Sequence, residues 1–141
     1  MTIGRLRSLL FAPAVRPDFI TKLPGRGADA VVIDCEDATP ANAKAEGRRH
    51  ARHLAPELIE AGCQTMVRVN ALPTEWIRAD IDDGLATGLT AIVLPKAEST
   101  VGLDAVAAML DAAGHPGLGI LAGIETALGV ADARPLLAHP R

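Results

Sequence analysis

Three carboxylates close a short apolar run near the start of the chain. The run Val31–Ile33 is β-branched throughout and leads into Asp34, Glu36 and Asp37. Such a run predicts a strand that is buried on both faces, as in parallel sheets. Chemistry in parallel α/β folds gathers just beyond the carboxyl ends of the strands. Three acids at one such end repel one another unless cations offset them, so we expect basic groups nearby.

Four further strand ends supply polar groups of the required kinds. They contribute Arg16, Arg68 with Asn70, Lys96, and Glu125. Carboxylate oxygens suit Mg²⁺, which takes one or two protein carboxylates together with water and substrate oxygens. An Arg at the tip (the carboxyl end) of a neighbouring strand suits a substrate carboxylate or a developing enolate oxygen. A metal ion beside an Arg is what a reaction through a carbanion next to a carbonyl needs.

The polar tips belong to five segments that predict buried strands, each followed by helical signals. The expected strands are Leu6–Ala12, Ala30–Cys35, Thr65–Val69, Ala91–Leu94 and Leu118–Ile124. A helix is expected after each strand. The first begins at Arg16-Pro17-Asp18 and ends at Gly25, the second covers Ala41–Leu54 with Pro56–Ala61 as an extension, and the third begins at Thr74 as its N-cap. The fourth begins at Ser99 or Thr100 and ends at Gly114, and the fifth covers Ala127–Leu137.

The alternation of strands and helices predicts an α/β fold with a mainly parallel sheet. The spacing of the tips fits a (β/α)₈ barrel of TIM type, in which each βα unit is about 31 residues long. The 141 residues hold about five such units, so the barrel is incomplete. A five-stranded doubly wound domain is the alternative. Its nucleotide-binding form is disfavoured because the turn Phe11–Arg16 contains no glycine.

Composition indicates one globular domain over residues 1–141. Hydrophobic residues make up 49 % and charged residues 22 %, and the formal net charge is −3. This charge gives no general attraction to nucleic acid or to an anionic membrane. The two cysteines, Cys35 and Cys63, indicate buried thiols rather than a disulfide framework. We therefore expect a soluble, cytoplasmic protein without a nucleic-acid or membrane partner.

Each polar group also has a purely structural interpretation. The three acids are equally compatible with ion pairs to Arg68 and Lys96 that fix the strand ends, and Lys96 with Glu98 is compatible with a solvated pair. The basic stretch Lys44–Arg52 is typical of a solvated helix face, the alternatives being an anion site or a structural partner for the acids. The four histidines have no metal-ligand spacing and are expected in ordinary surface or helix roles.

Five motifs in order carry a resemblance to a known family. They are Arg7–Pro13, Asp34–Asp37 with Lys44 following, Arg68–Asn70, Leu94–Glu98 and Glu125–Gly129. The set resembles the HpcH/HpaI aldolase superfamily, in its branch of citrate lyase β-subunit-like and malyl-CoA lyase proteins. Each motif is weak alone, but five in order along nearly the whole chain make a strong signal. Cys35 and Thr39 depart from the more usual apolar residues of the second motif.

The resemblance implies a (β/α)₈ barrel, usually oligomeric, that acts as a Mg²⁺-dependent carbon–carbon lyase on acyl-CoA thioesters. A malyl-, citramalyl- or citryl-type thioester would give acetyl-CoA and a 2-oxo acid. It implies that Glu125 binds Mg²⁺ and that Arg68 contacts the substrate and stabilises the thioester enolate. A second metal-binding Asp after the sixth strand has no counterpart in this sequence.

The same resemblance gives the other tip residues supporting roles. Glu36 and Asp37 would position Arg68 and Lys96 or contact metal-bound water, Lys96 and Arg16 would contact substrate, and Arg16 with Lys22 would face the CoA phosphates.

Two other functions are compatible with the sequence. One is a non-catalytic half-barrel whose exposed first and fifth strands favour association, so that it acts as an interaction module. The other is a flavodoxin-like sheet that binds a nucleotide.

Overall fold

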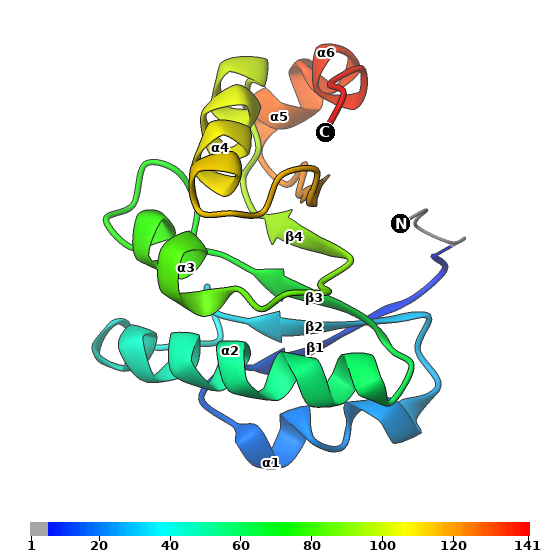
Figure 1. Ribbon diagram of the computed structural model, residues 1–141. Helices are drawn as coiled ribbons and strands as arrows, with labels where there is room; N and C mark the ends of the chain where they lie inside the picture. The colour runs from blue at the N-terminus through cyan, green and yellow to red at the C-terminus, as the bar shows by residue number, and fades with distance from the viewer. Residues whose placement is uncertain (1–5) are drawn as a thin grey trace.

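The computed structural model describes residues 6–141 and consists of strands and helices in alternation (Figure 1). The strands are β1 (Leu9–Pro13), β2 (Ala30–Asp34), β3 (Gln64–Arg68), β4 (Ala91–Leu94) and β5 (Gly119–Ala122). The helices are α1 (Pro17–Ile20), α2 (Lys44–Glu60), α3 (Ile77–Gly84), α4 (Thr100–Ala112), α5 (Ala127–Ala131) and α6 (Ala133–Leu137), with short 3₁₀ turns at Leu23–Arg26 and Ala41–Ala43.

The five strands form one parallel sheet in the order β1-β2-β3-β4-β5. Each strand therefore pairs with the next one along the chain. A doubly wound sheet instead reverses its strand order at a switch point, which is where it binds a nucleotide. The sequential order excludes the doubly wound alternative and agrees with five βα units of a barrel.

The two faces of the sheet carry different cores. The outer face packs on the helices and forms the large cluster, to which Val31, Ile33, Val67, Ile92 and Leu94 belong. The inner face forms a smaller cluster made of Ala30, Val32, Met66, Ala91 and Val93. Because side chains alternate between faces, the inner residues lie on the side that a closed barrel encloses.

The helices follow the curve of the sheet in chain order. Figure 1 shows α1, α2, α3 and α4 succeeding one another around its outside. Contacts join α1 to α2, α2 to α3, α3 to α4 and α4 to α6. This arrangement leaves the carboxyl ends of all strands at one end of the molecule, where the predicted site residues lie.

The first and last strands are shorter than predicted at one or both ends. β1 begins at Leu9 because the N–H groups of Arg7 and Ser8 donate to Asp29 Oδ2, at 2.8 and 3.0 Å, instead of entering the ladder. β5 ends at Ala122, after which Gly123 exchanges hydrogen bonds with Leu94 and Ala97 across the strand tips.

The helices agree with the prediction at α4 and differ from it at α3 and after β5. Thr74 does not cap α3; its hydroxyl donates to Ala71 O at 2.6 Å in a turn, and α3 begins only at Ile77. The expected helix Ala127–Leu137 is divided at Asp132 into α5 and α6, the second of which carries Pro135 in its first turn. Ser99 caps α4 through Gly102 N, as predicted. Among residues 6–141, no helix combines the length and apolarity needed to cross a membrane.

Candidate functional site at the strand tips

The tips of β2 and β3 are joined by a two-point ion pair. Asp34 and Arg68 are partners in the strand register, so both side chains point to the inner face of the sheet. Arg68 Nε donates to Asp34 Oδ1 at 2.7 Å and Nη2 to Oδ2 at 2.6 Å. Asp34 is buried, and its hydrogen bond raises the pKa of Arg68. The guanidinium is thus held charged and in one orientation.

Glu36 extends this pair into a network. Its side chain is buried, and Lys96 Nζ donates to Oε1 at 2.5 Å. Arg68 Nη1 lies 3.2 Å from Oε2, which is within ion-pair distance. The approach does not have hydrogen-bond geometry, and Oε2 is a buried oxygen without a hydrogen-bond partner among the described residues. One carboxylate therefore fixes two cations and keeps one acceptor position open.

Lys96 connects the network to β5. Its backbone is left-handed, with φ of 52°, which is uncommon for a residue with a side chain. In this conformation its N–H donates to Glu125 Oε1 at 3.0 Å while its ammonium reaches Glu36. The hydrogen bond to Glu36 raises the pKa of Lys96, so this amine stays protonated at neutral pH. Strained backbone of this kind is frequent in functional sites.

Glu125 is positioned by two close approaches of backbone to backbone. A Cβ on Gly123 would stand 3.1 Å from Leu94 O, and one on Gly129 would stand 2.5 Å from Ala97 O. These glycines let β5 and the start of α5 lie directly against the segment after β4. Thr126 caps α5 by accepting from Gly129 N at 3.0 Å. Glu125 stands exposed at this junction, with Oε1 engaged by Lys96.

Two residues of the predicted site lie at its margin. Asp37 is largely exposed, with 73 % of its side-chain surface accessible, and its Oδ1 is 3.8 Å from Lys96 Nζ. Arg16 lies beyond the tip of β1, where Asp18 binds it at 2.8 and 2.7 Å and the guanidinium stacks 3.7 Å from the Phe19 ring. Arg16 therefore takes no part in the network of Asp34, Arg68, Glu36, Lys96 and Glu125.

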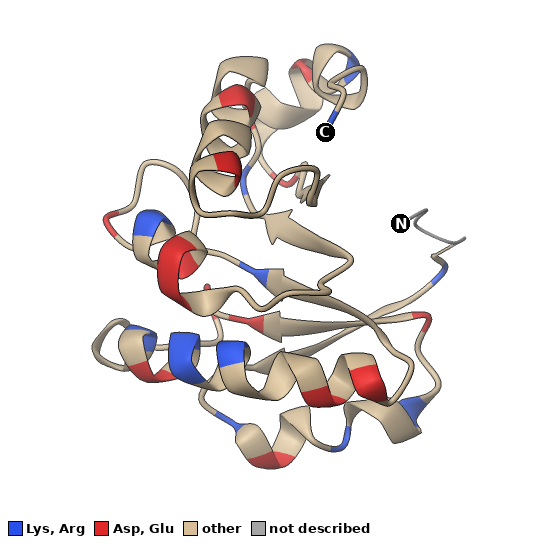
Figure 2. Ribbon diagram, viewed as in Figure 1, with Lys and Arg blue, Asp and Glu red and all other residues tan. Residues whose placement is uncertain are grey.

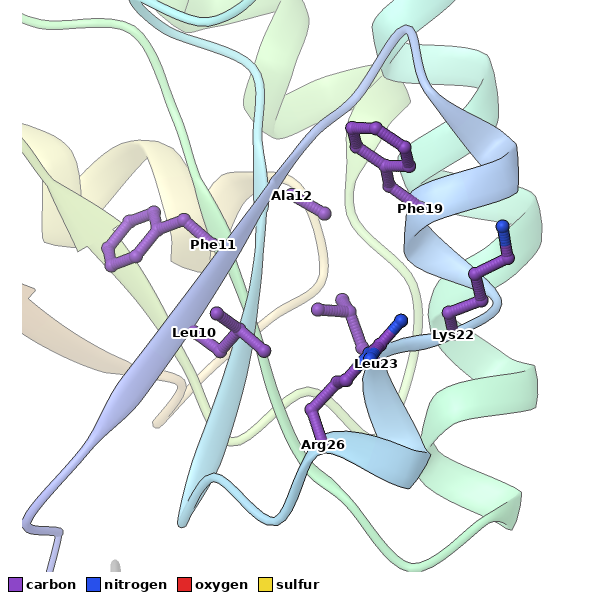
Figure 3. A pocket seen from close by; sticks show the side chains of 7 residues that line it. All are labelled: Leu10, Phe11, Ala12, Phe19, Lys22, Leu23 and Arg26. Atoms are coloured by element: carbon purple, nitrogen blue, oxygen red, sulfur yellow. The ribbon is translucent and has the colours of Figure 1, made fainter.

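Lys22 lies further from the tips, in a groove beside β1. The groove measures about 350 Å³ and is mainly apolar, with Lys22 and Arg26 on its rim (Figure 3). Phe11 and Phe19, which also line it, are 42 % and 44 % exposed. Phe11 additionally touches the network, since Arg68 lies 5.2 Å from its ring centre.

The basic stretch of α2 is predicted to form a solvated face, and that prediction is wrong for part of it. Figure 2 shows mostly basic positions in the first half of α2, with the acidic Glu46 among them, and acidic positions near its end. Lys44 is buried, and Arg48 forms an ion pair at 3.3 Å with the buried Asp80. Asp80 also accepts from Asn70 N at 2.8 Å. Arg48 is thus a structural partner of an acid, although of Asp80 rather than of the tip carboxylates, whereas Lys44 donates to the carbonyls of Cys35 and Glu36.

The sequence itself contains a pattern that predicts burial of Asp80 and Lys44. Asp80 falls between Ile77 and Ile81 on the buried face of α3, and Lys44 begins the buried stripe of α2 that continues with Ala51. A charge on an apolar stripe implies a buried partner of opposite sign or a set of hydrogen-bonding groups. Helical spacing in the amino-acid sequence is thus enough to mark both residues as buried charges.

Comparison with known proteins identifies the family. The model of the HpcH/HpaI aldolase/citrate lyase family matches residues 7–141. The chain belongs to this family. A citrate lyase subunit beta-like protein of Deinococcus radiodurans is 45 % identical over 139 residues, which are 96 % of this chain and 48 % of the relative. A (3S)-malyl-CoA thioesterase of Cereibacter sphaeroides is 36 % identical over 139 residues, or 96 % and 46 % of the two chains.

Solved structures of the HpcH/HpaI family share the fold. The citrate lyase beta subunit of Mycobacterium tuberculosis, complexed with oxaloacetate and magnesium, has a TM-score of 0.74 at 30 % identity, covering 94 % of this chain and 53 % of that one. A complex of the M. tuberculosis protein CitE with magnesium, acetoacetate and coenzyme A has a TM-score of 0.73 at 30 % identity, with coverages of 93 % and 44 %. The chain thus spans about half the length of the relatives it matches.

The described residues fit part of a magnesium site. No group of three His, Cys, Asp or Glu side chains in residues 6–141 is arranged to hold a metal ion. Mg²⁺ needs fewer protein ligands than that, because it commonly keeps several waters and binds one or two carboxylates with substrate oxygens. Glu125 is exposed and has one oxygen, Oε2, not used by Lys96. Its chemistry therefore suits a single protein ligand of Mg²⁺.

Proposed function

We propose that this chain carries the substrate-activating part of a Mg²⁺-dependent carbon–carbon lyase. The substrate is a 3-hydroxyacyl-CoA of malyl, citramalyl or citryl type, and the products are acetyl-CoA and a 2-oxo acid. The observation that carries the proposal is the continuous network from Asp34 through Arg68, Glu36 and Lys96 to Glu125, which spans four strand tips. Relatives whose names mention citrate lyase and malyl-CoA support it.

Arg68 stabilises the charge that develops when the carbon–carbon bond breaks. The electron pair of that bond moves toward the thioester carbonyl, which becomes an enolate. Asp34 occupies Nε and Nη2 of the guanidinium, and Nη1 lies 3.2 Å from Glu36 Oε2 without donating to it, so the N–H groups of Nη1 stay available to the substrate. A guanidinium already fixed in place needs no reorganisation as the charge forms, which is the source of its catalytic effect. Return to the enolate carbon of the proton that Asp37 takes from the substrate hydroxyl then gives acetyl-CoA and leaves Asp37 ionised again.

The remaining tip residues bind the metal ion, the oxo acid and the CoA phosphates and remove the hydroxyl proton. Glu125 would hold Mg²⁺, which when bound would supply Lewis-acid stabilisation of the substrate hydroxyl oxygen that becomes the oxo-acid carbonyl. Lys96 places a second cation beside the leaving oxo acid. Asp37, the exposed carboxylate of the β2 tip, takes the proton from the substrate hydroxyl, because Glu36 is already engaged by two cations. Arg16, beyond the tip of β1, and Lys22, in the groove beside β1, bind the CoA phosphates.

The test is release of a 2-oxo acid. The chain is incubated with malyl-CoA or citramalyl-CoA and Mg²⁺, and glyoxylate or pyruvate is measured by hydrazone formation. We expect product from the wild type and none from Arg68→Ala. Arg78→Ala, which breaks only the surface pair with Asp82 on α3, is the matched control and retains activity. A folded wild-type chain that releases no oxo acid would refute the lyase function for this chain.

The open edges of the sheet favour a second candidate, an interaction module that pairs with another copy of this chain. β1 pairs only with β2 and β5 only with β4 among the described strands, and the apolar groove with Phe19 lies beside β1. Unpaired strand edges promote association. Sedimentation tests this candidate: Phe19→Ser shifts a self-associating chain toward monomer, whereas Val101→Ser, at an exposed position of α4, does not. A monomeric wild type excludes it.

A further inference from the structure

The segment just after β2 is held by hydrogen bonds from several directions. Asp34 accepts from the N–H groups of Glu36 at 2.9 Å and of Ala38 at 3.3 Å. Thr39 donates its hydroxyl to Asp34 O at 2.8 Å and its N–H to Glu36 O at 3.0 Å. The backbone that bears Glu36 therefore has one well-defined conformation, and its side chain leaves this backbone in one direction.

Lys44 makes the strongest of these contacts. Its ammonium donates to Cys35 O at 2.8 Å and to Glu36 O at 2.7 Å, so it bridges two successive carbonyls. The residue is 6 % exposed, and Nζ lies 5.1 Å from the centre of the Trp76 ring. Burial lowers the pKa of Lys44, which shows that a charge here is costly unless these contacts hold it. Hydrogen bonds from a charged donor are about twice as strong as neutral ones.

Asn70 supports the same carbonyl from the neighbouring strand tip. Its Nδ2 donates to Cys35 O at 3.0 Å and to Asp80 Oδ2 at 2.6 Å. Asp80 in turn pairs with Arg48, one turn along α2 from Lys44. The start of α2, the tip of β3 and the buried face of α3 thus converge on the backbone immediately before Glu36.

We infer that Lys44 is a positioning residue that sets the direction of the Glu36 side chain and, through Glu36, the place of the Lys96 ammonium. Glu36 O and the Glu36 carboxylate belong to one residue, so a rotation of the backbone at 35–36 moves the carboxylate away from both cations. Lys44 is attached to the first turn of a 17-residue helix and prevents that rotation. This inference rests on the proposed function only in treating Glu36 and Lys96 as site residues.

The lysine content of the chain allows a direct test without substrate. The sequence contains three lysines, of which Lys44 is buried, Lys96 is paired with Glu36, and Lys22 is exposed. Brief acetylation of the folded chain, followed by mass spectrometry, gives the ratio of Lys96 to Lys22 labelling. The Glu36→Gln variant removes the carboxylate from Lys96 and sets the upper limit of this ratio.

Removal of the Lys44 ammonium should free Lys96. In Lys44→Met we expect the Lys96 to Lys22 ratio to rise severalfold, toward the value of Glu36→Gln, because a displaced Glu36 carboxylate no longer holds the Lys96 ammonium. Lys44→Arg, which keeps charged donors for the two carbonyls, should restore most of the wild-type ratio. General loosening of the fold would also raise the ratio, but it would expose the buried Cys35 thiol as well, so a raised ratio counts only in a chain whose Cys35 stays unreactive toward a disulfide reagent.

The outcomes separate this inference from the lyase proposal. A folded Lys44→Met chain with the wild-type ratio overturns the positioning role, whatever the activity of the wild type. If Lys44→Met does not fold, Lys44→Gln, whose shorter side chain keeps neutral N–H donors but loses the charge, is measured by the same ratio, and a wild-type ratio there overturns the positioning role. Absence of oxo-acid release in the wild type, with a raised ratio in Lys44→Met, refutes the lyase function and leaves the positioning role standing.

Discussion

Asp34 and Arg68 occupy matched register positions on adjacent parallel strands and join through two hydrogen bonds of 2.7 and 2.6 Å. Because matched positions point to the same face, the strand register itself brings the two side chains together at the inner end of the sheet. The pair is mostly buried, with side-chain exposures of 2 % for Asp34 and 19 % for Arg68. Its orientation is therefore a property of the sheet rather than of a flexible loop.

Loss of Asp34 should destabilise the fold far more than loss of an exposed partner of the same kind. Asp34→Ala leaves Arg68 without its two-point partner, and we expect the free energy of unfolding to fall by about 3 kcal/mol, as for other broken buried pairs. Asp18→Ala breaks the similar but exposed pair with Arg16 and should cost far less, because water screens that pair. Urea unfolding followed by the fluorescence of Trp76, the single tryptophan, measures both; equal losses would contradict the prediction.

Gly129→Ala should disturb the junction between β4 and α5. The new Cβ would meet Ala97 O at 2.5 Å, so α5 or the β4 tip must move, at a cost of about 1–3 kcal/mol. Gly25→Ala is the matched control, since a Cβ there meets no atom within 4 Å. Thermal unfolding should show a lower midpoint for Gly129→Ala and little change for Gly25→Ala. A Gly129→Ala chain with the wild-type midpoint would show that the contact is relieved without strain.

The sequence predicts the five strands well because strands of this kind depend on local pattern. All five strands lie where apolar runs occur, and the parallel arrangement brings Arg68, Glu36, Lys96 and Glu125 into one network. Register is not a local property, so the pairing of Asp34 with Arg68 rather than with Lys96 is visible only in the structure. The start of β1 escapes prediction for a related reason, because it depends on Asp29, 22 residues beyond Arg7.

The burial of Lys44 shows a second reason why prediction from the sequence falls short. Charge alone predicts a solvated face for it, whereas its hydrogen-bond partners are the carbonyls of Cys35 and Glu36. Every residue has a backbone carbonyl, so the sequence does not show which carbonyls a buried lysine will bind. The apolar stripe of α2 is the relevant signal, and it outweighs charge in deciding which way a helix faces.

The Cys35 thiol should resist reaction in the folded chain. Burial raises its pKa to about 12, so it is un-ionised at pH 8 and inaccessible to reagents. The partly exposed Cys63 should react first with a disulfide reagent, and Cys35 should react only on unfolding. Thiol titration at pH 8, before and after addition of urea, checks this. Two rapidly reacting thiols in the folded chain would contradict it.

The same thiol makes stability depend on alkaline pH. Its folded pKa is raised above the unfolded value of 9.0, so the unfolded chain loses this proton first as pH rises. The contribution is complete below pH 9 and is lost toward pH 12, with a slope of at most about 1.4 kcal/mol per pH unit. The lysines of the unfolded chain also lose protons in this range, so the measurement is the difference in the free energy of unfolding between wild type and Cys35→Ala. That difference should shrink as pH rises above 9; a constant difference would contradict the assignment.

Glu125 should bind Mg²⁺ through its carboxylate without being needed for the fold. In Glu125→Gln the amide oxygen still accepts from Lys96 N, so thermal stability should stay close to that of the wild type. The neutral amide is a poorer ligand, and we expect Mg²⁺ affinity in the presence of oxaloacetate to fall at least about tenfold, or about 1.4 kcal/mol. Glu98→Gln, an exposed carboxylate two residues after Lys96, is the matched control and should bind like the wild type. Isothermal titration with MgCl₂ distinguishes the three chains. Equal affinities in Glu125→Gln and wild type would remove Glu125 as a ligand, because the one change made is the loss of its negative charge.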